Sequence, residues 1–162
     1  MLYQLSYVGG AAKSSQARVA SSSVRELTAD EIEEFLRGQR IARIGCHAGG
    51  ETYVVPVIYA YGDGAVVTVT QEGRKVAMLR ENPRVCVEVD SYDTDGRGSW
   101  RSVIAYGDAE ELAGEEIDAA LALLRERFAR AAGREAAPRP LSPGTVVLRI
   151  RLETRSGRAV ER

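Results

Sequence analysis

Three strand-like segments that follow one another through glycine turns limit the fold of this chain more than any other feature. Residues 41–46 and 52–61 flank the turn Ala48-Gly49-Gly50, and Gly62-Asp63-Gly64 leads into residues 65–70. Turns this short connect antiparallel neighbours, whereas parallel strands need a crossover of about a dozen residues or more. The three segments are therefore predicted to form an antiparallel meander.

More strands and helices are predicted around this meander. Thr28 and Glu31 have the spacing of a capping box, so a helix is expected to begin there and to end at Gly38. The other predicted elements are helices at 73–82 and 115–131 and strands at 84–90, 100–106 and 145–154. We expect a mainly β fold of the α+β class, a small six-stranded antiparallel barrel with flanking helices.

Composition sets the outer limits on organisation and function. The 162 residues suit one domain at 24–162, preceded by a flexible tail at 1–23 that is rich in Ser, Gly and Ala. With 22 basic and 23 acidic residues, no broad basic surface for nucleic acid is expected. The longest apolar run, 53–61, is too short to span a bilayer, and the N-terminus does not have the pattern of a secretory signal. A cytoplasmic protein with no membrane partner is predicted.

A basic turn after the third strand of the meander is the first candidate site. Gly73, Arg74 and Lys75 follow Glu72 and open the predicted helix at 73–82. Helix starts present free backbone N–H groups and a partial positive charge, so they accept phosphate readily. Gly73 leaves room for a close approach, and the two basic side chains add charge. The alternative is that Arg74 and Lys75 simply solvate a surface helix.

The second candidate is the strand before that turn, which carries a proline. Val55, Pro56 and Val57 lie in a run that is apolar on both faces. Proline leaves a ladder position without a donor, so it belongs at an edge, at a bulge or where something lies against the backbone. A flat aromatic ring beside the strand would explain both features. An ordinary buried edge strand is the competing interpretation.

Several motifs then follow one another in a specific order. They are Gly45-Cys46-His47, residues 52–57, Glu72-Gly73-Arg74-Lys75, residues 80–90, and residues 100–104 followed by Tyr106-Gly107. In this order and spacing they resemble the pyridoxamine 5'-phosphate oxidase-like, FMN-binding split-barrel proteins, and within them the branch related to nitroimidazole-resistance proteins. The resemblance covers residues 27–154 and implies a six-stranded antiparallel split β-barrel.

The resemblance also implies where a cofactor would lie. In such proteins the basic pair after the third strand holds the FMN phosphate, here Arg74 and Lys75 beside Gly73. The second strand lies along the flavin ring, and the third lines the ribityl and phosphate path. The family's homodimers hold two FMN sites at their interface, so the segment around Trp100 would complete the partner's site. The further positions implied are Val55, Pro56, Val57, Thr68, Val69, Thr70 and Ser102.

The resemblance therefore predicts a homodimeric FMN flavoprotein, and an oxidoreductase acting on an unidentified small molecule. Deazaflavin F420 or haem in the same fold, or a flavin-binding or structural dimer without turnover, are the alternatives. His47 is the only histidine, and it is either a flavin- or substrate-facing group or a polar cap at a strand end. Cys46 and Cys86 form no CxxC motif, and no metal site is predicted.

Overall fold

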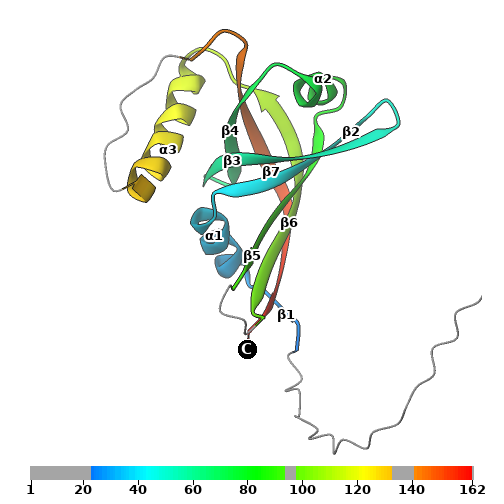
Figure 1. Cartoon of the computed structure of the whole chain (residues 1–162), viewed down its shortest axis with the longest axis vertical. Coiled ribbons are helices and arrows are strands. Elements are labelled where there is room, and N and C mark those ends of the chain that lie inside the picture. The colour runs from blue at the N-terminus through cyan, green and yellow to red at the C-terminus, as the bar shows by residue number, and fades with distance from the viewer. Residues whose placement is uncertain (1–22, 94–97, 133–140, 162) are drawn as a thin grey trace, which may run out of the picture.

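The computed structural model describes residues 23–93, 98–132 and 141–161 (Figure 1). Apart from Ser23, the predicted tail lies outside the described residues. The strands are β1 (Arg25–Glu26), β2 (Ile41–Ala48), β3 (Glu51–Gly62), β4 (Ala65–Gln71), β5 (Arg84–Tyr92), β6 (Trp100–Glu111) and β7 (Thr145–Val160). The helices are α1 (Ala29–Gly38), α2 (Arg74–Glu81) and α3 (Glu115–Ala132).

The strands form one antiparallel sheet in the order β1-β7-β4-β3-β2-β5-β6, and an additional β6–β7 pairing closes it into a barrel. The predicted meander β2-β3-β4 and the six long strands are confirmed. The sequence did not reveal β1, because a strand of two residues carries no readable alternation. It pairs with the last part of β7, beside the end of the described chain (Figure 1).

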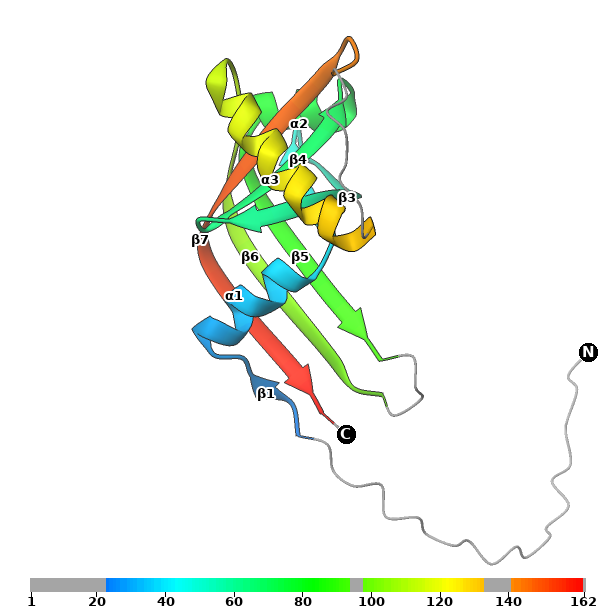
Figure 2. The same cartoon turned by 90° about the vertical axis from the view of Figure 1, so that its left-hand side faces the viewer.

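Two apolar clusters hold the helices in place. The larger fills the barrel interior and includes Leu27, Ile32 and Leu36, so α1 covers the opening of the barrel. The smaller lies outside, where α3 packs on β3, β4 and β7. Figure 2 shows α1 and α3 on the same side of the molecule, which leaves the outer face of β5 and β6 without a helix.

The capping box at the start of α1 forms as predicted. The Glu31 backbone N–H donates to Thr28 Oγ1 at 3.3 Å, and the Thr28 N–H donates to Glu31 Oε2 at 2.8 Å. These bonds satisfy two backbone donors that a helix start otherwise leaves without partners.

The last strand is longer than the predicted range 145–154, because β7 continues to Val160. Residues 153–156 are all exposed and polar, so the alternation that marks a strand is lost there. The backbone nevertheless continues its pairing with β6, after a register shift at Tyr106/Gly107. A Cβ atom added at Gly107 would lie 1.9 Å from the Arg151 carbonyl oxygen, so this close crossing of β6 and β7 requires glycine.

Candidate functional site

The start of α2 differs from the starts of the other two helices. Gly73 is its N-cap residue, so no side chain caps it, and its first turn carries no acidic residue. By contrast, α1 and α3 begin with acidic first turns. An added Cβ atom at Gly73 would meet nothing within 4 Å, so there is open space at this helix start. Backbone donors, positive dipole and open space together suit an anion.

Arg74 and Lys75, which follow Gly73, lie in different environments. Arg74 is exposed; its guanidinium pairs with the Glu51 carboxylate and lies 5.0 Å from the centre of the Tyr53 ring. Lys75 is half-buried, and burial lowers the pKa of its amine. Burial also raises the pKa of the neighbouring Cys46 thiol, so that side chain stays uncharged near neutral pH. Lys75 is thus a partly desolvated amine, which gains more than a fully solvated one from pairing with an anion.

The three predicted ring-contact residues of β3 do not share one face. Val57 is buried in the barrel core and Val55 is half-buried on the same side of the strand, while Pro56 is exposed on the outer face opposite Arg43. Alternation along a strand imposes this arrangement. A ring lying along β3 would therefore contact its backbone and only one set of these side chains.

The predicted β4 residues divide in a similar way. Thr68 is fully buried, and its hydroxyl donates to the Ile58 carbonyl oxygen at 2.7 Å. Val69 points the other way and is 38% exposed, and Thr70 is half-buried near the end of the strand. The Thr68 side chain therefore supports the sheet, and Thr70 is the β4 hydroxyl that lies nearest in sequence to the α2 turn.

Trp100 and Ser102 lie at the far end of the barrel from α2. The opposite end of β6 is next to α2, because Arg80 pairs with Glu111 at 2.6 Å. A strand rises about 3.3 Å per residue, so an extended strand of the 12 residues of β6 spans roughly 35 Å. The structure therefore does not bring Trp100 and Ser102 to the α2 turn within one protomer.

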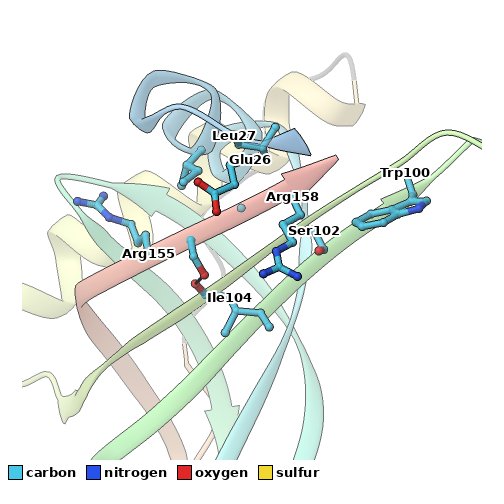
Figure 3. A pocket seen from close by; sticks show the side chains of 10 residues that line it. Glu26, Leu27, Trp100, Ser102, Ile104, Arg155 and Arg158 are labelled. Carbon is cyan, nitrogen blue, oxygen red and sulfur yellow. Dashed lines mark hydrogen bonds between the residues drawn. The ribbon is translucent and has the colours of Figure 1, made fainter. Parts of the chain in front are cut away.

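Trp100 and Ser102 instead line an open groove of about 610 Å³ on the outer face of β1, β7 and β6 (Figure 3). Ile104 continues their row on β6, and Arg158 enters from β7, whereas Arg155 borders the groove and turns its guanidinium to the other side of β7 (Figure 3). The groove combines an aromatic face, a hydroxyl and the guanidinium group of Arg158. Such a lining suits a planar ligand that carries negative charge.

The two arginines of this groove are not equivalent. Arg155 pairs with the Glu33 carboxylate and donates to the Tyr61 hydroxyl at 2.5 Å, and that hydroxyl donates to Glu33 at 2.7 Å. Burial and the Glu33 hydrogen bond raise the pKa of Tyr61 to about 12. Arg158 has no carboxylate partner within the described part of the chain.

His47 is exposed at the end of β2. Its Nδ1 lies 3.1 Å from the Thr52 hydroxyl, and its carbonyl oxygen accepts a hydrogen bond from the Asn82 amide at 2.8 Å. It lines a second outer groove of about 480 Å³ with Val54, Cys86 and other residues. The Thr52 and Asn82 contacts of His47 hold this strand end in place.

Four residues of these sites were not singled out by the sequence. Glu51 and Tyr53 flank Arg74, and Glu26 and Arg158 line the groove. Only Glu51 could have been found from the sequence. It begins the second strand of the predicted meander, and antiparallel pairing brings that end of the strand close to the basic turn that follows the third strand. The pairing of Arg155 with Glu33 of α1 depends on a contact distant in sequence, so the sequence pattern of the last strand does not reveal it.

Comparison with known proteins decides the family. A family model described as pyridoxamine 5'-phosphate oxidase matches residues 28–159, which is most of the chain. The chain belongs to this family. Within the described residues, no group of three or more His, Cys, Asp or Glu could hold a metal ion, and none of the described helices is long and apolar enough to cross a membrane.

Solved structures extend the comparison. A protein described as FAD-binding from Mesorhizobium loti is 35% identical, with a TM-score of 0.69 over 85% of this chain and 99% of that one. A putative 5-nitroimidazole antibiotic resistance protein from Bacteroides thetaiotaomicron shares the fold at 18% identity, with a TM-score of 0.67 over 85% of this chain and 87% of that one.

A curated relative, an uncharacterised protein of Rhizobium meliloti strain 1021, is 26% identical over 89 residues. That match spans 55% of this chain and 58% of the relative's length.

Proposed function

We propose that this protein is a homodimeric flavoprotein that holds the phosphate of FMN at the start of α2 and catalyses flavin-dependent redox chemistry on a small molecule. The uncapped helix start with Arg74 and Lys75 carries the proposal. Family membership supports a cofactor-binding barrel but leaves the reaction open, since one fold serves many activities. The flavin would supply the electron transfer, and the protein would bind and orient it.

The choice of FMN rests on charge. A terminal monophosphate carries close to two negative charges at neutral pH, about twice the charge of either phosphate in a dinucleotide linkage. Two basic side chains and a helix start at one place match the charge of the FMN monophosphate better than that of a single FAD phosphate. The Mesorhizobium loti relative is described as FAD-binding, so both flavins belong in the test.

The second half of the site would come from the partner subunit. Trp100 and Ser102 lie at the opposite end of β6 from α2 in their own chain, so a partner must supply them if they contact the same flavin. The outer sheet face between these two places is apolar enough to be covered by a second copy. Its exposed apolar side chains include Val54 at 59%, Ile58 at 58%, Ile104 at 41% and Tyr106 at 47% exposure.

The visible spectrum of the freshly purified protein is the first test, because FMN, deazaflavin F420 and haem absorb differently. The second is the affinity of the stripped protein for FMN and FAD. Replacing both Arg74 and Lys75 by alanine is expected to weaken FMN binding about a hundredfold, since each lost charged contact costs about tenfold or more.

Arg80→Ala is the matched control, because Arg80 lies on the same helix but pairs with Glu72 and Glu111. A colourless wild-type protein that binds neither flavin, or a double variant that binds FMN like the wild type, would overturn the cofactor assignment.

A further inference from the structure

Arg158 is the positive charge of the groove that Trp100 and Ser102 line, and no carboxylate of the described residues pairs with it. Figure 3 shows its guanidinium extending from β7 over β6, toward Ser102 and Ile104. Arg155, which borders the groove, points to the opposite face of β7 and is neutralised there by Glu33. Asp90, which stands opposite Ser102 across the β5–β6 ladder, is likewise paired, with Arg43 at 2.6 Å. The charge of Arg158 is therefore free to act on a bound ligand.

Glu26 is the remaining charged side chain of the groove. Its backbone is in register with Arg158 across the β1–β7 ladder, yet no ion pair joins the two side chains. In Figure 3 the Glu26 carboxylate lies beside Leu27, on the side of the groove away from the Arg158 guanidinium. Glu26 thus reduces the positive potential of the groove without occupying the hydrogen-bond donors of Arg158.

We propose that Arg158 stabilises the reduced form of the flavin held by the partner subunit, and so sets its reduction potential. This inference rests on the proposed function, in which the Trp100 groove completes the partner's flavin site. Reduction by two electrons and one proton adds a net negative charge to the flavin ring system. A fixed positive charge favours that state over the neutral oxidised ring, and this difference in binding is a shift in potential.

The expected size follows from Coulomb attraction at a half-exposed site. Arg158→Met should lower the preference of the protein for reduced over oxidised flavin about tenfold, which for a two-electron couple makes the midpoint potential about 30 mV more negative. Arg158→Lys, which keeps the charge, should remain close to the wild type. Glu26→Gln should shift the potential in the positive direction, because it removes the opposing charge.

The experiment is an anaerobic titration of the flavin-loaded full chain, with a reference dye reporting the potential. Dithionite, which is oxidised to sulfite, supplies the electrons, and water supplies the proton. Arg151→Met is the control: Arg151 lies near the middle of the same strand, outside the groove, and pairs with Glu110. This substitution removes the same charge from the chain without changing the groove, so the midpoint potential of its flavin should equal that of the wild type.

The outcomes separate this inference from the function on which it rests. A wild-type protein that binds neither FMN nor FAD overturns both. A flavin-loaded Arg158→Met protein with the wild-type potential overturns the role of Arg158 alone. If Arg158→Met does not retain flavin, Arg158→Gln, which keeps a polar side chain but not the charge, decides: a potential more negative than that of the wild type supports the inference, and an unchanged or more positive one overturns it.

Discussion

The carboxylate of Glu51 pairs with the guanidinium of Arg74 where β3 begins and α2 starts. Both side chains are more than half exposed, at 67% and 56%. Exposed ion pairs contribute only about 0–1 kcal/mol, so this one is a weak competitor for a phosphate with two charges. Tyr53, which lies under the guanidinium, keeps Arg74 directed at this position whether or not Glu51 is paired with it.

Removing the Glu51 charge should therefore strengthen cofactor binding. Glu51→Gln is expected to lower the dissociation constant for FMN about threefold, because Arg74 no longer has to leave a carboxylate. Fluorescence titration of the stripped protein measures this. Glu34→Gln, on the exposed face of α1, removes the same charge elsewhere and should have no effect. Unchanged or weaker binding in Glu51→Gln would argue against phosphate at Arg74.

Gly107 should tolerate no side chain. Gly107→Ala places a Cβ atom 1.9 Å from the Arg151 carbonyl oxygen, and the backbone of β7 must move to relieve the clash. We expect a loss of about 2–3 kcal/mol in the free energy of unfolding, measured with urea.

Gly38→Ala is the comparison for this variant. An added Cβ atom there meets nothing within 4 Å, and Gly38 is the last residue of a helix. This substitution should leave stability unchanged or raise it by up to about 1 kcal/mol. Equal effects of the two substitutions would contradict the close crossing of β6 and β7.

Glu31 should make stability depend on acid pH. Hydrogen bonds from Arg25, together with that from the Thr28 backbone, lower the pKa of Glu31 from its ordinary value of 4.5 to about 2. Because the folded state favours the charged carboxylate, this stabilisation is complete above about pH 4.5 and is lost as the pH falls toward 2. Glu31→Gln should therefore be less stable than the wild type at neutral pH, and the difference should narrow in that acid range. Urea midpoints across the range test this, and a constant difference would count against it.

The outer sheet face should control the oligomeric state. Val54→Asp places a charge in the middle of the exposed apolar side chains of β3 and β6, so it should shift the protein from dimer to monomer. Light scattering after size-exclusion chromatography measures the mass. Leu141→Asp, at an exposed leucine outside this face, should leave the dimer intact. A wild-type monomer, or a Val54→Asp dimer, would refute this interface.

Much of the fold could be predicted because its signals are local. The capping box at Thr28 and Glu31 acts within one helical turn, and the alternation of Val85, Val87 and Val89 places them on one face of β5. The end of β7 could not be predicted in this way. Its exposed polar residues 153–156 resemble a loop, and only pairing with β6 keeps them extended.

The candidate site likewise has one part that local sequence determines and another that depends on distant contacts. The sequence by itself determined the basic helix start, because Gly73, Arg74 and Lys75 are consecutive and a helix start needs no distant residue to attract an anion. Only the tertiary structure decided which charges remain free. Arg155 and Arg158 look alike in sequence, but α1 brings Glu33 to the first and nothing equivalent to the second. Closure of the barrel also separates Trp100 from Arg74, so a site that uses both needs a second chain. The charge that a side chain presents to a ligand depends on its neighbours in space, and so does the set of residues that can contact one ligand. Packing sets those neighbours.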